Sequence, residues 1–509
     1  MSDQDLNKIA SGAGIIFVGM ILSKIFAYLY RLIIARIGVS EYGLISLGLG
    51  IIGIISSISI IGLHRGVLRN VSYYRGKEDF GKVKGVITLA LKISLGISLV
   101  LSILLFIFSD FISVRYFHNE DLSLIIKILA VSIPLSVMNE IILNTILGFQ
   151  KVVYMVISKN IILNLSRFLL TIAFVLFSRN ILGLAWIYVI SFLVSFIFSF
   201  YFLERKVFPI LITKIKSISV GKELFSFSWP LVFSGLGMLL VGWTDTIMLG
   251  FFKTVNEVGY YNTALPTSHL LYIVPQGLMM MVIPTLTYLF SRKEMDKFNI
   301  ITRTTTKWVF MINLILFSLF MMFGKEIISI LFGAQYSIAG DVLRILSVGF
   351  FINYTMIFMG HMPIIKNRPK WDLFNISIVA ITNIILNFIL IPPYGIFGAA
   401  IATSVSFVIF GIIEFVEALY IFNVDNPIKL VYLKVIISII IASFLTSYLA
   451  NNLISVNNLI NLVIISLILT IVYSVLLIVT RSFDKEDSEV IKSIQNKIGI
   501  NIPFIDRFI

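Results

Sequence analysis

The sequence predicts an all-α integral membrane protein with about 14 transmembrane helices, and two observations lead to this prediction. Of its 509 residues, 58% are hydrophobic and only 13% are charged, which is roughly half the charged fraction of soluble domains. The apolar residues come in blocks of about 20, the length that a helix needs to cross a bilayer core. This composition excludes a secreted enzyme, and the absence of cysteine excludes a disulfide scaffold, thiol catalysis and cysteine-ligated zinc.

The apolar blocks, taken in chain order, define the predicted spans. They lie near residues 9–35, 43–70, 86–108, 122–148, 158–177, 182–203, 223–251, 258–290, 301–323, 337–363, 372–390, 396–419, 432–450 and 458–480. The first, second, seventh, eighth and tenth are longer than a bilayer is thick, so we expect them to tilt, kink or project beyond it. Three prolines at nine-residue intervals should kink the eighth span: Pro266, Pro275 and Pro284.

The basic residues predict the orientation of the chain. There are 40 Lys and Arg against 26 Asp and Glu, a net charge of +14, and most of the bases in loops fall on one side of the predicted membrane. The positive-inside rule places both termini in the cytoplasm of a plasma-membrane protein. Topology and attraction to anionic lipids account for the excess charge, so we expect no nucleic-acid partner. The first apolar run is too long for a cleavable signal peptide.

The chain contains an internal repeat, which predicts two lobes. Glu41-Tyr-Gly43 after the first span matches Glu257-Val-Gly259 after the seventh. Because six spans separate the copies, the halves enter the membrane in the same orientation, the usual arrangement of an alternating-access transporter. A duplicated passive scaffold is the alternative. The predicted parts are an N-terminal six-helix lobe (1–204), a cytoplasmic linker (205–222), a C-terminal six-helix lobe (223–420), two further helices (421–480) and a cytoplasmic tail (481–509).

Several motifs resemble those of the multidrug/oligosaccharidyl-lipid/polysaccharide flippase superfamily. The resemblance is closest to the polysaccharide and lipid-linked oligosaccharide flippases, which are related to the lipid II flippases. The motifs are Ile37-Gly-Val-Ser-Glu-Tyr-Gly43, Trp243-Thr-Asp245-Thr-Ile-Met-Leu-Gly250, Glu257-Val-Gly-Tyr-Tyr-Asn-Thr-Ala264 and the stretch from Asn383 to Thr403. The resemblance covers about residues 8–480 and implies two six-helix lobes, a central cationic cavity and two extra C-terminal helices.

A group of intramembrane bases predicts an anion-binding site in the first half. Lys24 and Arg31 are seven residues apart in the first span and share a helical face, with Tyr28 between them. Arg65 lies in the second predicted span. Placing a charged base inside a membrane costs free energy, so such a residue normally faces an aqueous cavity or an anionic partner. Lys and Arg bind phosphate groups well, so a lipid pyrophosphate headgroup fits this group and the function that the resemblance implies.

The other intramembrane bases have a second interpretation. Lys92, Arg167 and even Arg65 could extend toward an interface, as long basic side chains do. Arg344, near the start of the tenth span, is a weaker candidate on the other lobe. Glu140 in the fourth span is the clearest intramembrane acid available to the bases of the first half.

Polar residues in the second half predict a cation site. Asp245 lies in the seventh span, Asn383 and Asn387 share a face of the eleventh, and Thr403 follows in the twelfth. These oxygen ligands suit Na⁺, and the set resembles the sodium site of the lipid II flippases. Asn387 departs from that pattern, which has a second carboxylate there, and this places sodium use in doubt. The alternative is that the asparagines only join helices by hydrogen bonds.

Two further acids and the C-terminal tail also have expected contacts. Glu414 and Glu417, one turn apart in the twelfth span, are expected to meet Lys429 or Lys434, with a proton relay as the other interpretation. The amphipathic segment 484–498 is expected to lie on the inner leaflet.

These observations predict a flippase that moves a polyprenyl-(pyro)phosphate-linked saccharide from the cytoplasmic to the outer leaflet by alternating access. No bond is made or broken, and no cofactor is expected beyond coupling to Na⁺ or H⁺. The expected partners are the glycan lipid, membrane lipids and glycan-assembly proteins, with the chain acting as a monomer. The alternatives are a cation-coupled multidrug-type antiporter, a membrane-embedded transferase, for which no cluster of metal-ligating residues appears, and a passive assembly factor.

Overall fold

The computed structural model describes residues 3–178, 180–452, 455–484, 486 and 487, and most of these residues are helical. No strand occurs within these ranges, so the predicted fold class is confirmed. Twelve of the described helical segments are long and apolar enough to cross a membrane, and a bent pair adds a thirteenth. The remaining predicted span, 223–251, coincides with the 32-residue helix α10 (Gly221–Phe252). The chain is therefore a multi-pass membrane protein.

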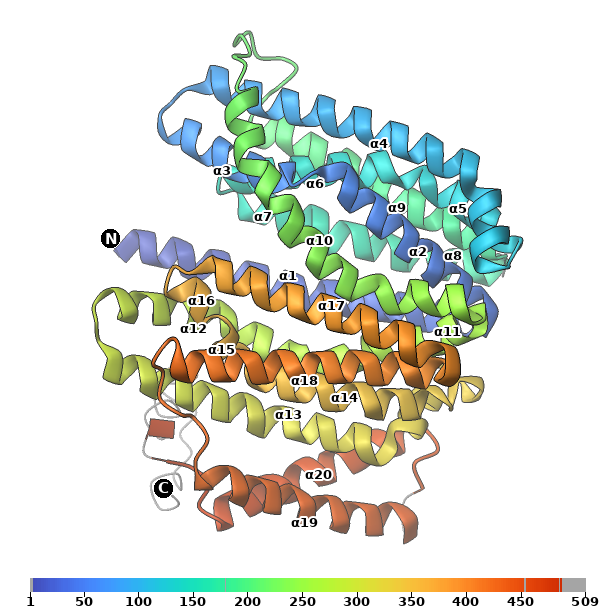
Figure 1. Cartoon of the computed structure of the whole chain (residues 1–509), viewed down its shortest axis with the longest axis vertical. Helices are drawn as coiled ribbons and strands as arrows, with labels where there is room; N and C mark the ends of the chain where they lie inside the picture. Colours follow the sequence, from blue (N-terminus) through green and yellow to red (C-terminus); the bar gives the residue numbers. More distant parts are fainter. Residues whose placement is uncertain (1–2, 179, 453–454, 485, 488–509) are drawn as a thin grey trace. The chain divides into compact units, whose positions relative to one another are not determined.

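The helices follow one another in the order that Figure 1 shows. Those of the first half are α1 (Asp3–Ala35), α2 (Val39–Ile60), α3 (Leu63–Gly76), α4 (Phe80–Phe117), α5 (Asp121–Ala130), α6 (Ser132–Gly148), α7 (Val152–Val156), α8 (Leu163–Phe177) and α9 (Ile181–Phe202). Those that follow are α10, α11 (Val255–Ser268), α12 (Ile273–Ser291), α13 (Met295–Phe332), α14 (Ala339–Thr355), α15 (Ile357–Gly360), α16 (Met362–Ile365), α17 (Pro369–Tyr394), α18 (Ile396–Tyr420), α19 (Leu430–Asn452) and α20 (Leu459–Val479).

Three of the five overlong predicted spans are broken, as their length led us to expect. The second divides into α2 and α3 at Ile61 and Gly62, whose φ angles of 44° and 66° are left-handed. Glycine adopts such angles freely, whereas a β-branched residue does so rarely. The eighth is interrupted by a 3₁₀ turn at His269–Tyr272 between α11 and α12. The tenth bends by 59° between α14 and the short helices α15 and α16.

Two compact units make up the chain. The first contains Met1–Asn262 and Ile384–Ala399, and the second contains Thr263–Asn383 and Ala400–Ile509. Because α17 contributes to both units, a division by sequence position alone does not describe them. The lobe and linker boundaries taken from the sequence remain predictions.

Each unit has its own apolar core. In the first, fully buried residues of α3, α4 and α6 pack together, among them Leu63, Val86 and Ile141. In the second, α12, α13 and α18 contribute Leu286, Phe298 and Ala418 to a buried cluster. The last two helices, α19 and α20, pack against each other and against α13. Apolar side chains therefore hold the helices of each unit around a common interior.

The glycines of the repeated motif form reciprocal close contacts inside the first unit. A Cβ atom placed on Gly43 of α2 would lie 2.0 Å from the backbone oxygen of Val255, at the start of α11. A Cβ atom placed on Gly259 of α11 would lie 2.4 Å from the backbone oxygen of Val39, at the start of α2. Neither distance leaves room for a side chain. The repeat in the sequence therefore marks a symmetric helix-to-helix contact.

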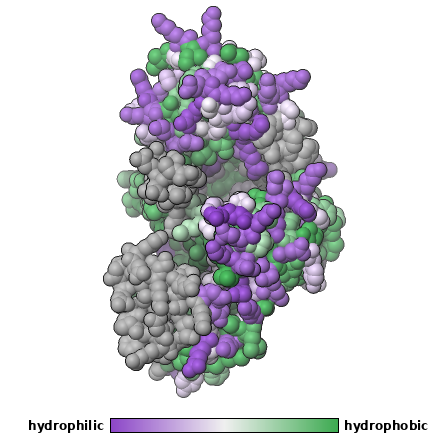
Figure 2. Space-filling view, turned by 90° about the vertical axis from the view of Figure 1, so that its left-hand side faces the viewer, coloured by the Kyte–Doolittle hydropathy of each residue, from purple (hydrophilic) through white to green (hydrophobic). Residues whose placement is uncertain are grey.

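Hydrophilic side chains gather at the helix ends that carry α15 and α16 in Figure 1, as Figure 2 shows, whereas hydrophobic side chains cover the flanks. Arg292 and Lys297, on either side of the α12–α13 turn, are exposed bases, with side-chain exposures of 58% and 71%. This distribution suits helices whose flanks face lipid and whose ends face water.

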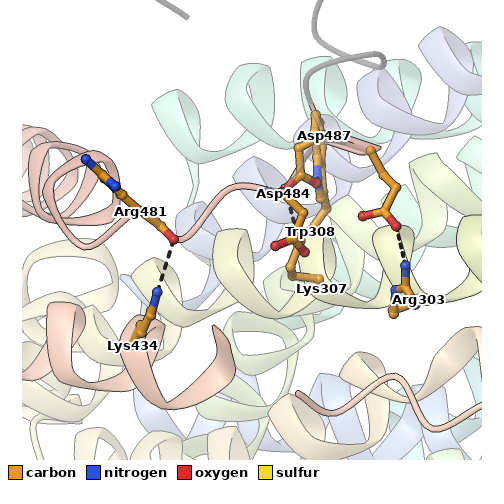
Figure 3. A network of polar contacts seen from close by, with 8 residues as sticks. Arg303, Lys307, Trp308, Lys434, Arg481, Asp484 and Asp487 are labelled. Carbon is orange, nitrogen blue, oxygen red and sulfur yellow. Dashed lines mark hydrogen bonds and ion pairs between the residues drawn. The ribbon is translucent and has the colours of Figure 1, made fainter. Parts of the chain in front are cut away.

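The first residues of the tail fold back onto α13 in the second unit (Figure 3). Lys307 is 5% exposed and pairs with Asp484 at 2.8 Å and with the fully buried Asp487. The Trp308 indole donates a hydrogen bond to Asp487 at 2.7 Å, and Arg303 pairs with Glu486. The start of the segment expected on the inner leaflet is therefore bound to a helix, and residues 488–498 lie outside the described part of the chain.

Candidate functional site: bases on α1 and a buried aspartate

The predicted headgroup residues of α1 lie on one helix, as their spacing requires. Lys24, Tyr28 and Arg31 are all half-buried. Arg31 lies close enough to the Tyr42 side chain of α2 to interact with it. The Tyr42 hydroxyl in turn donates a hydrogen bond of 2.9 Å to the carbonyl oxygen of Asn262. Arg31 thus lies beside a polar chain that runs from α2 to α11 within the first unit.

Arg65 is placed differently from the prediction. It lies in the first turn of α3, directly after the left-handed break at Ile61 and Gly62, and its side chain is exposed. The predicted second span continued across this break, because hydropathy does not depend on backbone angles. Arg65 therefore belongs to the start of a short helix and not to the middle of a span.

The remaining bases of the first half have distinct surroundings. The Arg167 guanidinium lies 4.1 Å from the ring centre of Tyr188, with Tyr30 and Phe192 at 5.4 and 5.6 Å. Such contacts between a cation and aromatic faces offset part of the cost of burying the charge. Lys92 of α4 is exposed.

Two of the predicted ionic candidates are already paired. Glu140, the acid expected to serve the intramembrane bases, is bound to Lys159 at 2.9 Å. Arg344 of α14 pairs with Asp341 at 2.7 Å and donates to the backbone oxygen of Met321 at 3.0 Å. Arg344 therefore links α14 to the backbone of α13.

The structure joins Asp245 to one of its predicted partners. Asp245 of α10 is only 3% exposed, and its Oδ1 accepts a hydrogen bond of 2.6 Å from the Asn387 amide of α17. Its other oxygen accepts a hydrogen bond from the Tyr261 hydroxyl of α11. Tyr261 is fully buried and was not predicted from the sequence, although it lies within the Glu257–Ala264 motif.

The other two predicted ion ligands also form a pair. The Asn383 amide donates a hydrogen bond of 3.1 Å to the Thr403 hydroxyl, and both residues are buried in the second unit. Asp245 and Asn387 belong to the first unit, so the four predicted ligands form two hydrogen-bonded pairs, one in each unit. Within the described residues, no three His, Asp or Glu side chains are placed to hold a metal ion together.

A neighbouring polar group connects the aspartate with the start of α2. The Asn262 side chain donates to the Thr246 hydroxyl at 3.1 Å and to the Val258 carbonyl at 3.0 Å. Thr246 follows Asp245 on α10, and the Asn262 backbone oxygen accepts from Tyr42. The arrangement joins α2, α10 and α11 by hydrogen bonds. It offers no nucleophile and base pair for covalent chemistry.

Comparison with known families decides the family of the chain. Residues 9–290, more than half of the chain, match the model of a family described as polysaccharide biosynthesis protein. The chain belongs to this family. The resemblance drawn from the sequence motifs is thereby confirmed.

A curated relative agrees with that membership. The chain is 29% identical over 197 residues to a probable low-salt glycan biosynthesis flippase, Agl15 of Haloferax volcanii, a match that covers 38% of this chain and 42% of the relative. The chain thus matches less than half the length of that relative. The relative's name describes a flippase and not a catalyst, which agrees with the prediction of a non-enzyme.

Solved structures place this family member in a known transporter fold. The lipid II flippase MurJ in an inward closed conformation matches with a TM-score of 0.69 and 17% identity, over 91% of this chain and 97% of the other. An inward-facing multidrug transporter of the MOP superfamily matches with a TM-score of 0.66 and 16% identity, over 78% and 93%. These likenesses show the fold alone.

Proposed function

We propose that the chain is a flippase that moves a polyprenyl-(pyro)phosphate-linked saccharide from the cytoplasmic to the outer leaflet for cell-surface glycan synthesis. The observation that carries the proposal is the pair of bases on one face of α1, Lys24 and Arg31, both half-buried in a segment long and apolar enough to cross a membrane. A cation in such a place favours an anionic ligand. Family membership and the flippases among the relatives support the same function.

In this proposal, Lys24 and Arg31 bind the phosphate groups while the hydrocarbon tail stays in lipid. Arg31 can donate two parallel hydrogen bonds to phosphate oxygens, and Lys24 supplies a compact second charge. Tyr28, between them on the helix, belongs to the same proposed headgroup site. Exposed Arg65 would meet the headgroup as it enters. Both termini are placed in the cytoplasm by the positive-inside rule, and the chain acts as a monomer.

Asp245 and Asn387 are the residues that would hold a coupling sodium ion. Carboxylate and amide oxygens are hard ligands that fit Na⁺, but Asn387 now presents its amide nitrogen to Asp245. An ion at Asp245 would require Asn387 to turn its oxygen inward. Sodium binding would then replace this hydrogen bond with an ion that bridges Asp245 of α10 and Asn387 of α17.

A reconstituted flipping assay tests the proposal. The purified protein is placed in vesicles containing a fluorescent polyprenyl diphosphate-linked disaccharide, and a membrane-impermeant quencher reports the lipid that reaches the outer leaflet. We expect Arg31→Ala and Lys24→Ala to slow flipping roughly ten- to a hundredfold, since each removes a charge-assisted hydrogen bond of about 1.5–3 kcal/mol. A sodium gradient should change the wild-type rate but not that of Asp245→Asn.

Lys92→Ala is the matched control, because it removes an exposed base from the same half of the chain. It should flip lipid at the wild-type rate. Equal loss in all three base variants would contradict the specific role given to Lys24 and Arg31. Wild-type vesicles that export an organic cation and leave the lipid in place would favour the antiporter instead.

A further inference from the structure

Two buried carboxyl groups lie one turn apart on α18 in the second unit, and neither is among the residues assigned above. Glu414 is 8% exposed and Glu417 is 6% exposed. The sequence suggested that they would meet Lys429 or Lys434. Within the described part of the chain, no Lys, Arg or His nitrogen lies within 4.0 Å of either carboxyl, and Lys434 instead donates to the backbone oxygen of Arg481.

Amide side chains from neighbouring helices take the place of the expected cations. Asn353 of α14 donates to Glu414 at 3.3 Å, and Asn375 of α17 donates to Glu417 at 2.6 Å. Moving a carboxylate out of water costs free energy, and a hydrogen bond from a neutral donor offsets only a small part of this cost. A carboxyl in such a place is stable in its neutral form, as a carboxylic acid.

The charged groups around the pair do not supply a counter-ion. Asp372 of α17 interacts electrostatically with Glu414, and its negative charge opposes a second one. Lys366, in the loop that leads to α17, donates to the backbone oxygen of Phe422. Burial lowers the pKa of the Lys366 ammonium, and Arg368 in the same loop adds to this effect.

The Asn375 amide provides a second, independent observation. Asn375 is 2% exposed, and its Nδ2 donates to one oxygen of Glu417. Its buried Oδ1 has no hydrogen-bond donor among the residues that the structure describes. Buried acceptors of this kind are normally satisfied. A proton on the second oxygen of Glu417 would donate to Oδ1 and close the paired ring that a carboxylic acid forms with an amide.

Glu414 also connects the two sides of a bent span. Asn353 lies before the bend at Met356, and Gly360 lies after it. A Cβ atom on Gly360 would lie 2.1 Å from Oε1 of Glu414, so this carboxyl packs directly against the α15 backbone. The span bends by 59° between α14 and α15–α16. The charge state of Glu414 therefore acts on both arms of the bend.

We propose that Glu414 and Glu417 form a proton-binding site in the second unit that controls the bend between α14 and α15. Glu417, nearer the end of α18, takes a proton from water at the α15–α16 face and holds it against Asn375. Once Glu414 has released its own proton, transfer from Glu417 one turn inward restores it and leaves Glu417 able to accept another. The only bonds made or broken are O–H bonds. The site is separate from Lys24 and Arg31, so it stands whether or not the transported molecule is a glycan lipid.

Infrared spectroscopy of the full-length protein in lipid tests this site without any transport substrate. A protonated carboxyl in an apolar place gives a carbonyl stretching band that is separate from the amide bands and shifts in D₂O. We expect the wild-type protein at neutral pH to show this band. We expect Glu417→Gln and Glu414→Gln, which keep the side-chain shape and the amide contacts, each to remove part of it.

Glu294→Gln is the control, because Glu294 is paired with Lys297 at 2.8 Å and is ionised at neutral pH. That variant should keep the whole band. A wild-type spectrum without the band overturns the proposal without any variant having to fold. A band that survives intact in both α18 variants, when each elutes as a folded monodisperse species, overturns it as well.

Discussion

Replacing Asp487 with alanine is expected to destabilise the protein by about 3–5 kcal/mol, the usual cost of removing one partner from a buried ion pair. Asp487 is fully buried and pairs with Lys307, which is itself 5% exposed. It also accepts the Trp308 indole hydrogen bond at 2.7 Å. Without it, a buried ammonium keeps only Asp484 and the indole N–H loses its acceptor. The measurement is the apparent Tm of the detergent-solubilised protein, followed by loss of monodisperse material on heating.

Two companion variants separate the buried charge from the tail as a whole. Asp484→Ala removes a carboxylate that is 35% exposed and that also pairs with Lys307, so its Tm should fall much less. The double variant Lys307→Met with Asp487→Leu removes both charges and should be more stable than Asp487→Ala. If Asp487→Ala has the same apparent Tm as the wild type, the tail contact does not stabilise the second unit.

Replacing Gly43 with alanine is expected to be the second most damaging change. The new Cβ would lie 2.0 Å from the Val255 backbone oxygen, and a backbone atom cannot rotate away as a side chain can. Forcing α2 from α11 should cost about 1–3 kcal/mol or more, as overpacking does. The same change at Gly259, which approaches Val39 reciprocally, should have a similar effect on the apparent Tm.

Gly96→Ala provides the comparison, because a Cβ on Gly96 of α4 meets nothing within 4 Å. This variant should be neutral or more stable, since alanine is the better helix former by about 1 kcal/mol. Equal destabilisation by all three glycine substitutions would show that helix propensity, and not the reciprocal contact, governs the loss.

The hydropathy of the sequence was sufficient to predict the membrane spans and to indicate which of them could be kinked. The length of an apolar block is set by the thickness of the bilayer, so α9 and α20 appear where their blocks do, whereas α4 extends beyond its block at both ends. The excess length of the second, eighth and tenth blocks likewise indicated kinks. The position of a break is set by local backbone angles, as at Ile61 and Gly62, and a hydropathy pattern does not contain that information.

Only part of the candidate site could be predicted, namely the residues that spacing along one helix or the family resemblance indicated. Spacing placed Lys24 and Arg31 on one face, and the resemblance indicated Asp245 with Asn387. Neither could identify Tyr261 as a partner of Asp245, because that contact depends on how α11 packs against α10.

The same limit applies to the acids of α18. Their position near the end of the helix indicated nearby lysines, but the packing of α14 and α17 against α18 determines which side chains reach them. Asn353 and Asn375 do so. Because both are neutral, a search of the sequence for charged partners does not find them.

The most direct test of the central claim is mass spectrometry of membrane lipids from cells depleted of this protein. We predict that a polyprenyl-linked saccharide accumulates, that the intact protein and Lys92→Ala clear it, and that Lys24→Ala and Arg31→Ala do not clear it although they reach the membrane. Accumulation would also identify the transported glycan. An unchanged lipid profile accompanied by increased sensitivity to cationic compounds would contradict the flippase account and the role given to the bases of α1.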